Sequence, residues 1–151
     1  MSDFSKSKLL MITAFIIFCC RTVSASLTDC ADIQTKYGTV SGVLDAKSGT
    51  CSYKGIPYAA PPVGDLRWAP TQPPALWKAT IKADKFRDVC IQEPFSLMGG
   101  ASDKYEGSED CLYLNVWHTA TVPAKSRAVI VFIHGGSNLT GAGSLELYDG
   151  A

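Results

Sequence analysis

The chain has 151 residues, with 14 basic and 14 acidic side chains and a formal net charge of +0 at pH 7. Because no basic face stands out, this composition excludes nucleic acid and anionic membrane surfaces as expected partners. The length corresponds to one domain.

The first 25 residues have the features of a secretory signal peptide. Two lysines precede an apolar run at 9–20, and short residues follow at 23–25, where a signal peptidase reads the chain. A run of twelve residues is shorter than the roughly twenty that a membrane-spanning helix needs. We therefore predict a signal peptide over residues 1–25, no stable membrane anchor after its cleavage, and a secreted or periplasmic chain over residues 26–151. Cleavage removes three basic residues and one acidic residue, which leaves 11 basic and 13 acidic residues and a net charge of −2.

Four cysteines remain after the predicted cleavage. They are Cys30, Cys51, Cys90 and Cys111. In an exported chain this number indicates two disulfides, for which three connectivities are open. Two histidines, His118 and His134, are too few and too far from cysteine pairs to predict a structural metal site, and we expect no cofactor.

The region from residue 33 to residue 86 reads as short strands around a proline-rich crossing. Residues 33–58 alternate loosely between polar and apolar side chains and are punctuated by glycines, which predicts two or three antiparallel strands joined by tight turns. Residues 61–76 hold five of the eight prolines, so they are expected to form an extended surface crossing without a regular ladder. Residues 77–86 could form one more short strand or a turn.

The second half of the chain contains two different kinds of predicted strand. After a polar, glycine-bearing loop at 94–108, residues 112–118 alternate as a half-exposed strand, and a polar turn follows at 119–127. The next segment, 128–134, has no polar residue until its last position, which predicts a buried strand that needs cover on both faces. Helices normally give such cover. Residues 26–151 contain no convincing amphipathic helix, so we expect the sequence to be the front part of a larger fold.

The buried strand ends in His134-Gly135-Gly136, followed by Ser137. Glycines at this place permit unusual backbone angles and leave N–H groups uncovered. Two such donors aimed at one point stabilise the negative oxygen that develops in acyl transfer. A bare Gly-Gly would favour an ordinary strand-to-loop turn, but esterases build their oxyanion loop from His-Gly-Gly after a buried strand. We expect His134 to hold the turn through a hydrogen bond and not to act as the catalytic base.

Three motifs resemble a known family. They are YKGIPYAAPPVGDLRW at 53–68, SEDCLYLNVW at 108–117 and HGGSNLTGAGSLELYDGA at 134–151. In this order they are similar to the motifs of the type B carboxylesterase and cholinesterase group of α/β-hydrolases, over residues 33–151. The resemblance implies an α/β fold, of which residues 26–151 supply the small antiparallel sheet and the first strands of the large central sheet.

The same resemblance implies roles for the residues of the turn. Gly136 and Ser137 match the two positions whose N–H groups form the oxyanion hole, and Gly135 shapes the turn. The third donor would come from the residue after the nucleophile. The family usually has glycine in place of Ser137 and an aromatic residue in place of Asn138. Serine keeps the N–H group, although its Cβ narrows the allowed backbone angles.

The resemblance also implies disulfides. Cys90 and Cys111 match the family's first disulfide, which closes a loop over the gorge entrance. Cys30 and Cys51 are then left as the second pair, which departs from the commonest pattern of the family.

One ion pair and three aromatic residues complete the implied framework. Arg67 and Glu109 match a structural ion pair between the crossing and the second motif, and two solvated charges are the alternative from sequence alone. Trp68, Tyr113 and Trp117 are expected to be core residues rather than ligand contacts.

The residues that break bonds in this family are absent from the sequence. No serine from residue 26 onward lies in a G-x-S-x-G pentapeptide, the elbow that carries the nucleophile. We therefore expect a truncated secreted serine carboxylesterase, whose full-length form hydrolyses small-molecule carboxylic esters, while this part alone is inactive. The alternatives are a non-catalytic, cholinesterase-like adhesion or binding protein and a self-sufficient secreted β module.

One further pattern concerns modification. Asn138-Leu139-Thr140 has the form of a glycosylation acceptor. A glycan there would crowd the reacting centre, so an ordinary polar loop residue is the preferred interpretation of Asn138.

Overall fold

The fold is given by a computed structural model, which describes residues 30–94, 104–121 and 126–151. The predicted signal peptide over residues 1–25 lies outside the described residues, as does most of the polar loop expected at 94–108. None of the helices within the three described ranges is both long enough and apolar enough to cross a membrane.

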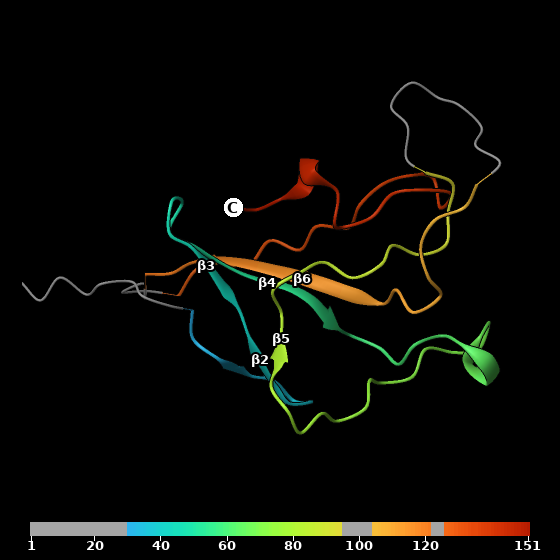
Figure 1. The fold of residues 1–151 in the computed structure, drawn as a ribbon, viewed down its shortest axis with the longest axis horizontal. Helices are drawn as coiled ribbons and strands as arrows, with labels where there is room; N and C mark the ends of the chain where they lie inside the picture. The colour runs from blue at the N-terminus through green and yellow to red at the C-terminus, as the bar shows by residue number, and fades with distance from the viewer. Residues whose placement is uncertain (1–29, 95–103, 122–125) are drawn as a thin grey trace, which may run out of the picture.

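The first sheet has three very short strands in the order β1-β2-β5 (Figure 1). The strands are β1 (Ile33–Gln34), β2 (Thr39–Ser41) and β5 (Ile81–Lys82). β1 pairs antiparallel with β2, as the alternation predicts, whereas β5 pairs parallel with β2, with Val40 opposite Ile81. The Trp77 side chain covers the β1–β2 turn and donates a hydrogen bond from Nε1 to the Thr39 carbonyl at 2.9 Å. A Cβ on Gly38 would lie 2.4 Å from this indole ring, so only glycine fits there.

The second sheet is antiparallel throughout and has the order β3-β4-β6. Its strands are β3 (Val43–Asp45), β4 (Thr50–Pro57) and β6 (Tyr113–Thr119). The alternating pattern at 112–118 thus predicted a real strand, shifted by one residue. The β4–β6 register changes between Tyr53 and Ile56, where Gly55 adopts a φ of 76°. Its N–H donates to the Asn115 side chain of β6 at 2.8 Å, which fastens the irregularity.

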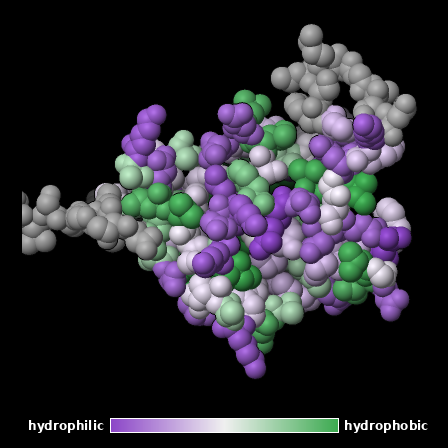
Figure 2. Space-filling view, viewed as in Figure 1, coloured by the Kyte–Doolittle hydropathy of each residue, from purple (hydrophilic) through white to green (hydrophobic). Residues whose placement is uncertain are grey.

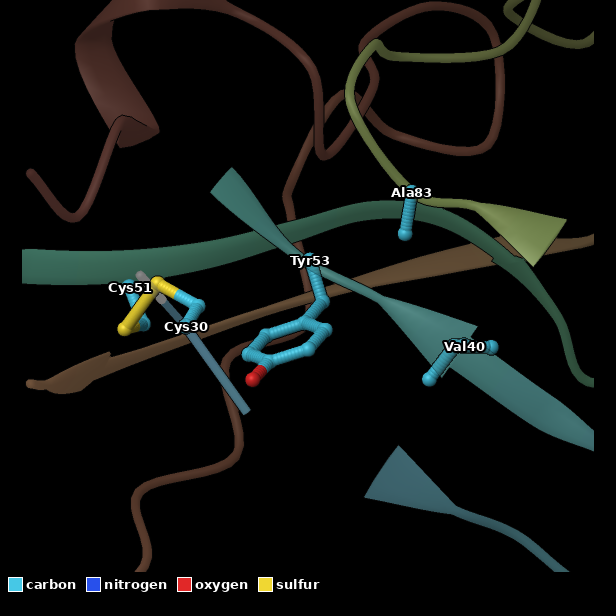
Figure 3. Close-up of a cluster of buried hydrophobic side chains, with 5 residues drawn as sticks. All are labelled: Cys30, Val40, Cys51, Tyr53 and Ala83. Atoms are coloured by element: carbon cyan, nitrogen blue, oxygen red, sulfur yellow. A yellow bond between two sulfur atoms is a disulfide. The ribbon is translucent and has the colours of Figure 1, made fainter. Parts of the chain in front are cut away.

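A small core joins the two sheets. It consists of Cys30, Val40, Cys51, Tyr53 and Ala83 (Figure 3). Val40 comes from β2 and Tyr53 from β4, so the cluster holds strands of different sheets together. The Tyr53 hydroxyl donates to the Ala31 carbonyl at 2.5 Å, which satisfies the polar end of this buried ring.

The proline-rich crossing at 61–76 contains no strand, as expected, and holds one short 3-10 helix, η1 (Gly64–Leu66). The expectation that Trp68 belongs to the core is wrong, because its side chain is 97% exposed and its φ is 61°. The crossing extends away from both sheets in Figure 1, and exposure follows from that position. Tyr113 and Trp117 are half-buried, and the Trp117 ring packs 6.3 Å from the Phe86 ring, centroid to centroid.

The apolar segment at 128–134 is not the buried strand that its sequence predicts. It forms no ladder with any described strand, and the side chains of Val129 through Ile133 are between 62% and 91% exposed. A strand needs a neighbour to pair its backbone and a layer to cover its side chains, and no described segment provides either. The segment is extended and continues into the rest of the chain, orange to red in Figure 1. On the face drawn in Figure 2, hydrophobic and hydrophilic residues are intermixed.

Candidate oxyanion loop

The segment after 128–134 folds back on itself as a tight loop. The Gly136 carbonyl accepts hydrogen bonds from the N–H groups of Leu139 at 3.0 Å and Thr140 at 3.2 Å. The two residues between have positive φ angles, 56° for Ser137 and 58° for Asn138, which is the pattern of a type I′ turn. A Cβ on Gly136 would lie 1.7 Å from the Thr140 carbonyl oxygen, so the closed loop requires glycine there.

Two consecutive backbone donors of this loop have no acceptor in the part of the chain that the structure describes. Neither the Gly136 N–H nor the Ser137 N–H donates a hydrogen bond to any residue in the described ranges. Ser137 is exposed and Gly136 half-buried. Successive uncovered N–H groups can form a concave site that attracts an anion, so this turn is a candidate for donors to a developing oxyanion.

His134 stabilises the beginning of the loop, as the sequence predicts. Its Nδ1 lies 2.9 Å from the Gly135 carbonyl oxygen. Gly141 returns against the same two residues: a Cβ on Gly141 would lie 2.5 Å from the Gly135 oxygen and 3.0 Å from the His134 Nδ1. Gly135 therefore lies where the entering and returning backbones meet.

Gln92 is a residue of this site that the sequence does not reveal. It is buried, and its side chain contacts Thr140 and Gly141 at the returning end of the loop. The only feature of the sequence that could have indicated a role for Gln92 is its position two residues after Cys90. A glutamine just before an expected polar loop has no pattern that predicts burial.

The structure contains both expected disulfides, the pair that the resemblance implies and the pair that is then left over. Cys90 is bonded to Cys111, and Cys30 to Cys51. The first disulfide lies beside a short bridge between Gln92 and Glu106, in which each backbone N–H donates to the other carbonyl, at 3.0 and 2.9 Å. The Cys90–Cys111 loop is thus closed by covalent and hydrogen bonds next to the oxyanion loop.

Arg67 and Glu109 form an ion pair across the first two motifs. Arg67 Nη2 lies 2.5 Å from Glu109 Oε2, and the two side chains are 53% and 33% exposed. The hydrogen bond to Glu109 raises the pKa of the Arg67 guanidinium above its ordinary value. Because the pair is accessible to water, it fixes the position of the crossing more than it stabilises the fold.

The middle of the third motif is also held against β6. Asn115 donates from Nδ2 to the Gly143 carbonyl at 3.3 Å. Close by, burial raises the pKa of the Tyr113 hydroxyl, and its hydrogen bond to Asp110 at 2.8 Å adds to the rise. The second and third motifs therefore contact each other directly.

The model of the carboxylesterase family matches residues 29–151. This chain belongs to the carboxylesterase family. The matched range contains the candidate oxyanion loop, both disulfides and the ion pair described above.

Curated members of the carboxylesterase family with different activities resemble the chain. It is 41% identical over 119 residues to the para-nitrobenzyl esterase of Bacillus subtilis, which covers 79% of the chain and 24% of that protein. It is 43% identical over 117 residues to the juvenile hormone esterase of Tribolium castaneum, a match that covers 76% of the chain and 19% of that protein. It is 34% identical over 151 residues to the acetylcholinesterase of Electrophorus electricus, a match that covers 94% of the chain and 24% of that protein. The chain thus spans a quarter or less of the length of these relatives.

Solved esterase structures have the same fold. A para-nitrobenzyl esterase superposes with a TM-score of 0.69 at 41% identity, over 80% of the chain and 24% of that structure. A Geobacillus stearothermophilus carboxylesterase gives a TM-score of 0.65 at 38% identity, over 79% and 22%. The fold class is therefore that of the α/β-hydrolase esterases, as the three motifs predict.

Proposed function

We propose that residues 26–151 carry the oxyanion loop of a secreted serine carboxylesterase that hydrolyses small-molecule carboxylic esters. Membership of the carboxylesterase family supports the reaction class. The observation that carries the assignment to this loop is the pair of adjacent N–H groups, at Gly136 and Ser137, that lack an acceptor among the described residues.

In the proposed reaction a serine hydroxyl attacks the ester carbonyl carbon, and the carbonyl oxygen takes up negative charge. The N–H groups of Gly136 and Ser137 donate to that oxygen, and a third donor comes from the residue after the nucleophile. Expulsion of the alcohol gives an acyl-enzyme, which water then hydrolyses. One such donor contributes about 3 kcal/mol of transition-state stabilisation.

The nucleophile, the acid and the histidine base are contributed in this proposal by a further segment of the protein. The absence of a G-x-S-x-G pentapeptide from residue 26 onward supports this division, and so does the quarter of the para-nitrobenzyl esterase that the chain matches. Residues 26–151 alone are then inactive.

Export is part of the proposal. The charged and apolar pattern of residues 1–25 and the two disulfides both suit a secreted or periplasmic protein. The chemistry needs protein groups and water alone, so the expected ligand is the ester substrate.

A chimera tests the loop assignment. Residues 30–151 replace the matching part of the Bacillus subtilis para-nitrobenzyl esterase, and in this proposal the remainder of that enzyme supplies the catalytic serine. We expect the chimera to hydrolyse a para-nitrobenzyl ester. Gly136→Ala should lower kcat by about 100-fold or more with little change in KM, because its Cβ collides with the Thr140 carbonyl and displaces the donors.

Gly49→Ala is the matched control, since Gly49 also has a positive φ, 68°, but its Cβ would meet nothing within 4 Å. A folded chimera in which Gly136→Ala and Gly49→Ala behave alike would contradict the assignment. A folded chimera without activity would instead favour a cholinesterase-like binding protein.

A further inference from the structure

Apart from the hydroxyl of Tyr53, the side chain of Gln92 is the one polar side chain buried among the described residues, with 7% of the Gln92 surface exposed. Both the oxygen and the nitrogen of its amide group form hydrogen bonds. Oε1 accepts from Thr140 Oγ1 at 2.9 Å and from the Gly141 N–H at 2.5 Å. Nε2 donates to the Cys90 carbonyl at 2.9 Å and to the Gly141 carbonyl at 3.1 Å.

This arrangement fixes the orientation of the loop as well as its position. A single amide group binds both the N–H and the carbonyl of Gly141, so the peptide backbone there can neither shift nor rotate without losing a hydrogen bond. The same oxygen holds the neighbouring Thr140 hydroxyl, whose side chain also approaches the Glu93 carbonyl at 3.4 Å.

Thr140 connects Gly141 to the two donors, the N–H groups of Gly136 and Ser137. Thr140 donates from its backbone N–H to the Gly136 carbonyl at 3.2 Å, and the Gly136 Cα is packed against the Thr140 carbonyl. The tip of the loop has little other support, because Ser137, Asn138 and Leu139 are exposed.

The other end of this connection is rigid. Gln92 follows Cys90 by two residues, Cys90 is bonded to Cys111, and the Gln92 backbone is paired with Glu106. The Gln92 amide therefore joins the segment closed by the disulfide to the returning segment of the loop. A displacement of one segment would displace the other.

We propose that Gln92 is the positioning residue of the oxyanion loop, which it holds through Gly141 and Thr140 so that the Gly136 and Ser137 N–H groups keep their direction. This inference rests on the proposed function for its catalytic consequence. Gln92 does not touch the substrate; it acts through the loop backbone.

The test uses the intact protein expressed from its complete gene, with Gln92→Ala, Gln92→Glu and the control Gln72→Ala. Gln72 also donates from Nε2 to a carbonyl two residues earlier, that of Pro70 at 3.0 Å, but it is exposed and forms no hydrogen bond with the described residues of the loop. Gln92→Glu preserves the size of the side chain and the acceptor for the Gly141 N–H, so it serves if Gln92→Ala fails to fold.

The first readout is amide hydrogen exchange, which requires no esterase activity. In Gln92→Ala the Gly141 amide should exchange about tenfold faster, because its acceptor is lost, while the β4 and β6 amides should keep their rates. In Gln92→Glu the Gly141 amide should stay protected. Unchanged exchange at Gly141 in Gln92→Ala, or equal acceleration in Gln72→Ala, would overturn the inference.

The second readout is the kinetics of ester hydrolysis. Misplaced donors should lower kcat by about 10- to 100-fold in both Gln92 variants, with KM nearly unchanged. A rise in KM without a fall in kcat would overturn the positioning role. If the unmodified protein hydrolyses no ester, the proposed function fails, and the exchange experiment still decides whether Gln92 holds the loop.

Discussion

At the scale of single residues, the loop is strained where the sequence departs from the usual family pattern. Ser137 and Asn138 both have positive φ angles, a region that costs an ordinary L-residue about 1–2 kcal/mol. Asparagine tolerates this region because its side chain forms hydrogen bonds with the nearby backbone, whereas the serine hydroxyl forms weaker ones. Ser137 nevertheless keeps the N–H group on which the proposed chemistry depends.

Ser137→Gly should therefore stabilise the protein by about 1 kcal/mol, since glycine has no Cβ to strain at this φ. Turnover should change little because the N–H group remains. Urea unfolding and kcat of the full-length enzyme measure the two effects. Asn138→Gly is the control and should give a smaller gain in stability. A hundredfold rise in kcat in Ser137→Gly would show instead that serine cripples the oxyanion hole.

The sequence predicts the residues of the site whose role lies in the backbone or in a motif. His134 ends an apolar run and Gly135 and Gly136 follow it, and that local context predicts the turn that the structure shows there. Gln92 could not be predicted, because its burial depends on a contact with Gly141, 49 residues away. Trp68 was misplaced for a related reason: an aromatic side chain predicts burial, but nothing local says whether a crossing lies against a sheet.

At the scale of elements, the two disulfides differ in what they fasten. Both join cysteines 21 residues apart. Cys51 lies in β4 and in the core, whereas Cys90 lies on the exposed segment that leads to Gln92. Equal loop lengths predict similar stabilisation of the fold in the chain-entropy model, but only the Cys90–Cys111 disulfide adjoins the oxyanion loop.

Replacing both cysteines of either pair by serine should therefore lower the free energy of unfolding by about 3 kcal/mol. Only the Cys90→Ser, Cys111→Ser variant should also lower kcat, since it releases the segment that carries Gln92. Each variant acts as the control for the other, with denaturant unfolding and steady-state kinetics measured at a temperature where both remain folded. An equal loss of kcat in the two variants would contradict the coupling.

The strands were predictable where their pairing is local. The alternation at 33–58 predicted two or three strands, where the structure has β1, β2, β3 and β4, and the alternation at 112–118 predicted a strand close to β6. The parallel pairing of β5 with β2 was not predicted, because it joins Val40 to Ile81 across the whole proline-rich crossing. A two-residue strand has too little pattern to be distinguished from a turn.

At the scale of the whole molecule, the described chain has a small core and a long uncovered apolar segment. Five buried residues join the two sheets, while Val129, Ile130 and Val131 are each more than 80% exposed. Composition alone predicted that this segment needs cover on both faces. The conformation of a central strand depends on its neighbours, so the sequence could not predict the extended, unpaired state observed.

The central claim is that residues 26–151 supply oxyanion donors but no nucleophile. Reaction with a fluorophosphonate, which bonds covalently to an activated serine, tests it most directly, in parallel with hydrolysis of a para-nitrobenzyl ester. The polypeptide 26–151 should form no adduct and release no product above background, whereas the chimera should form one adduct per molecule and turn over. A compact, monomeric 26–151 that is labelled stoichiometrically and hydrolyses the ester would contradict the account.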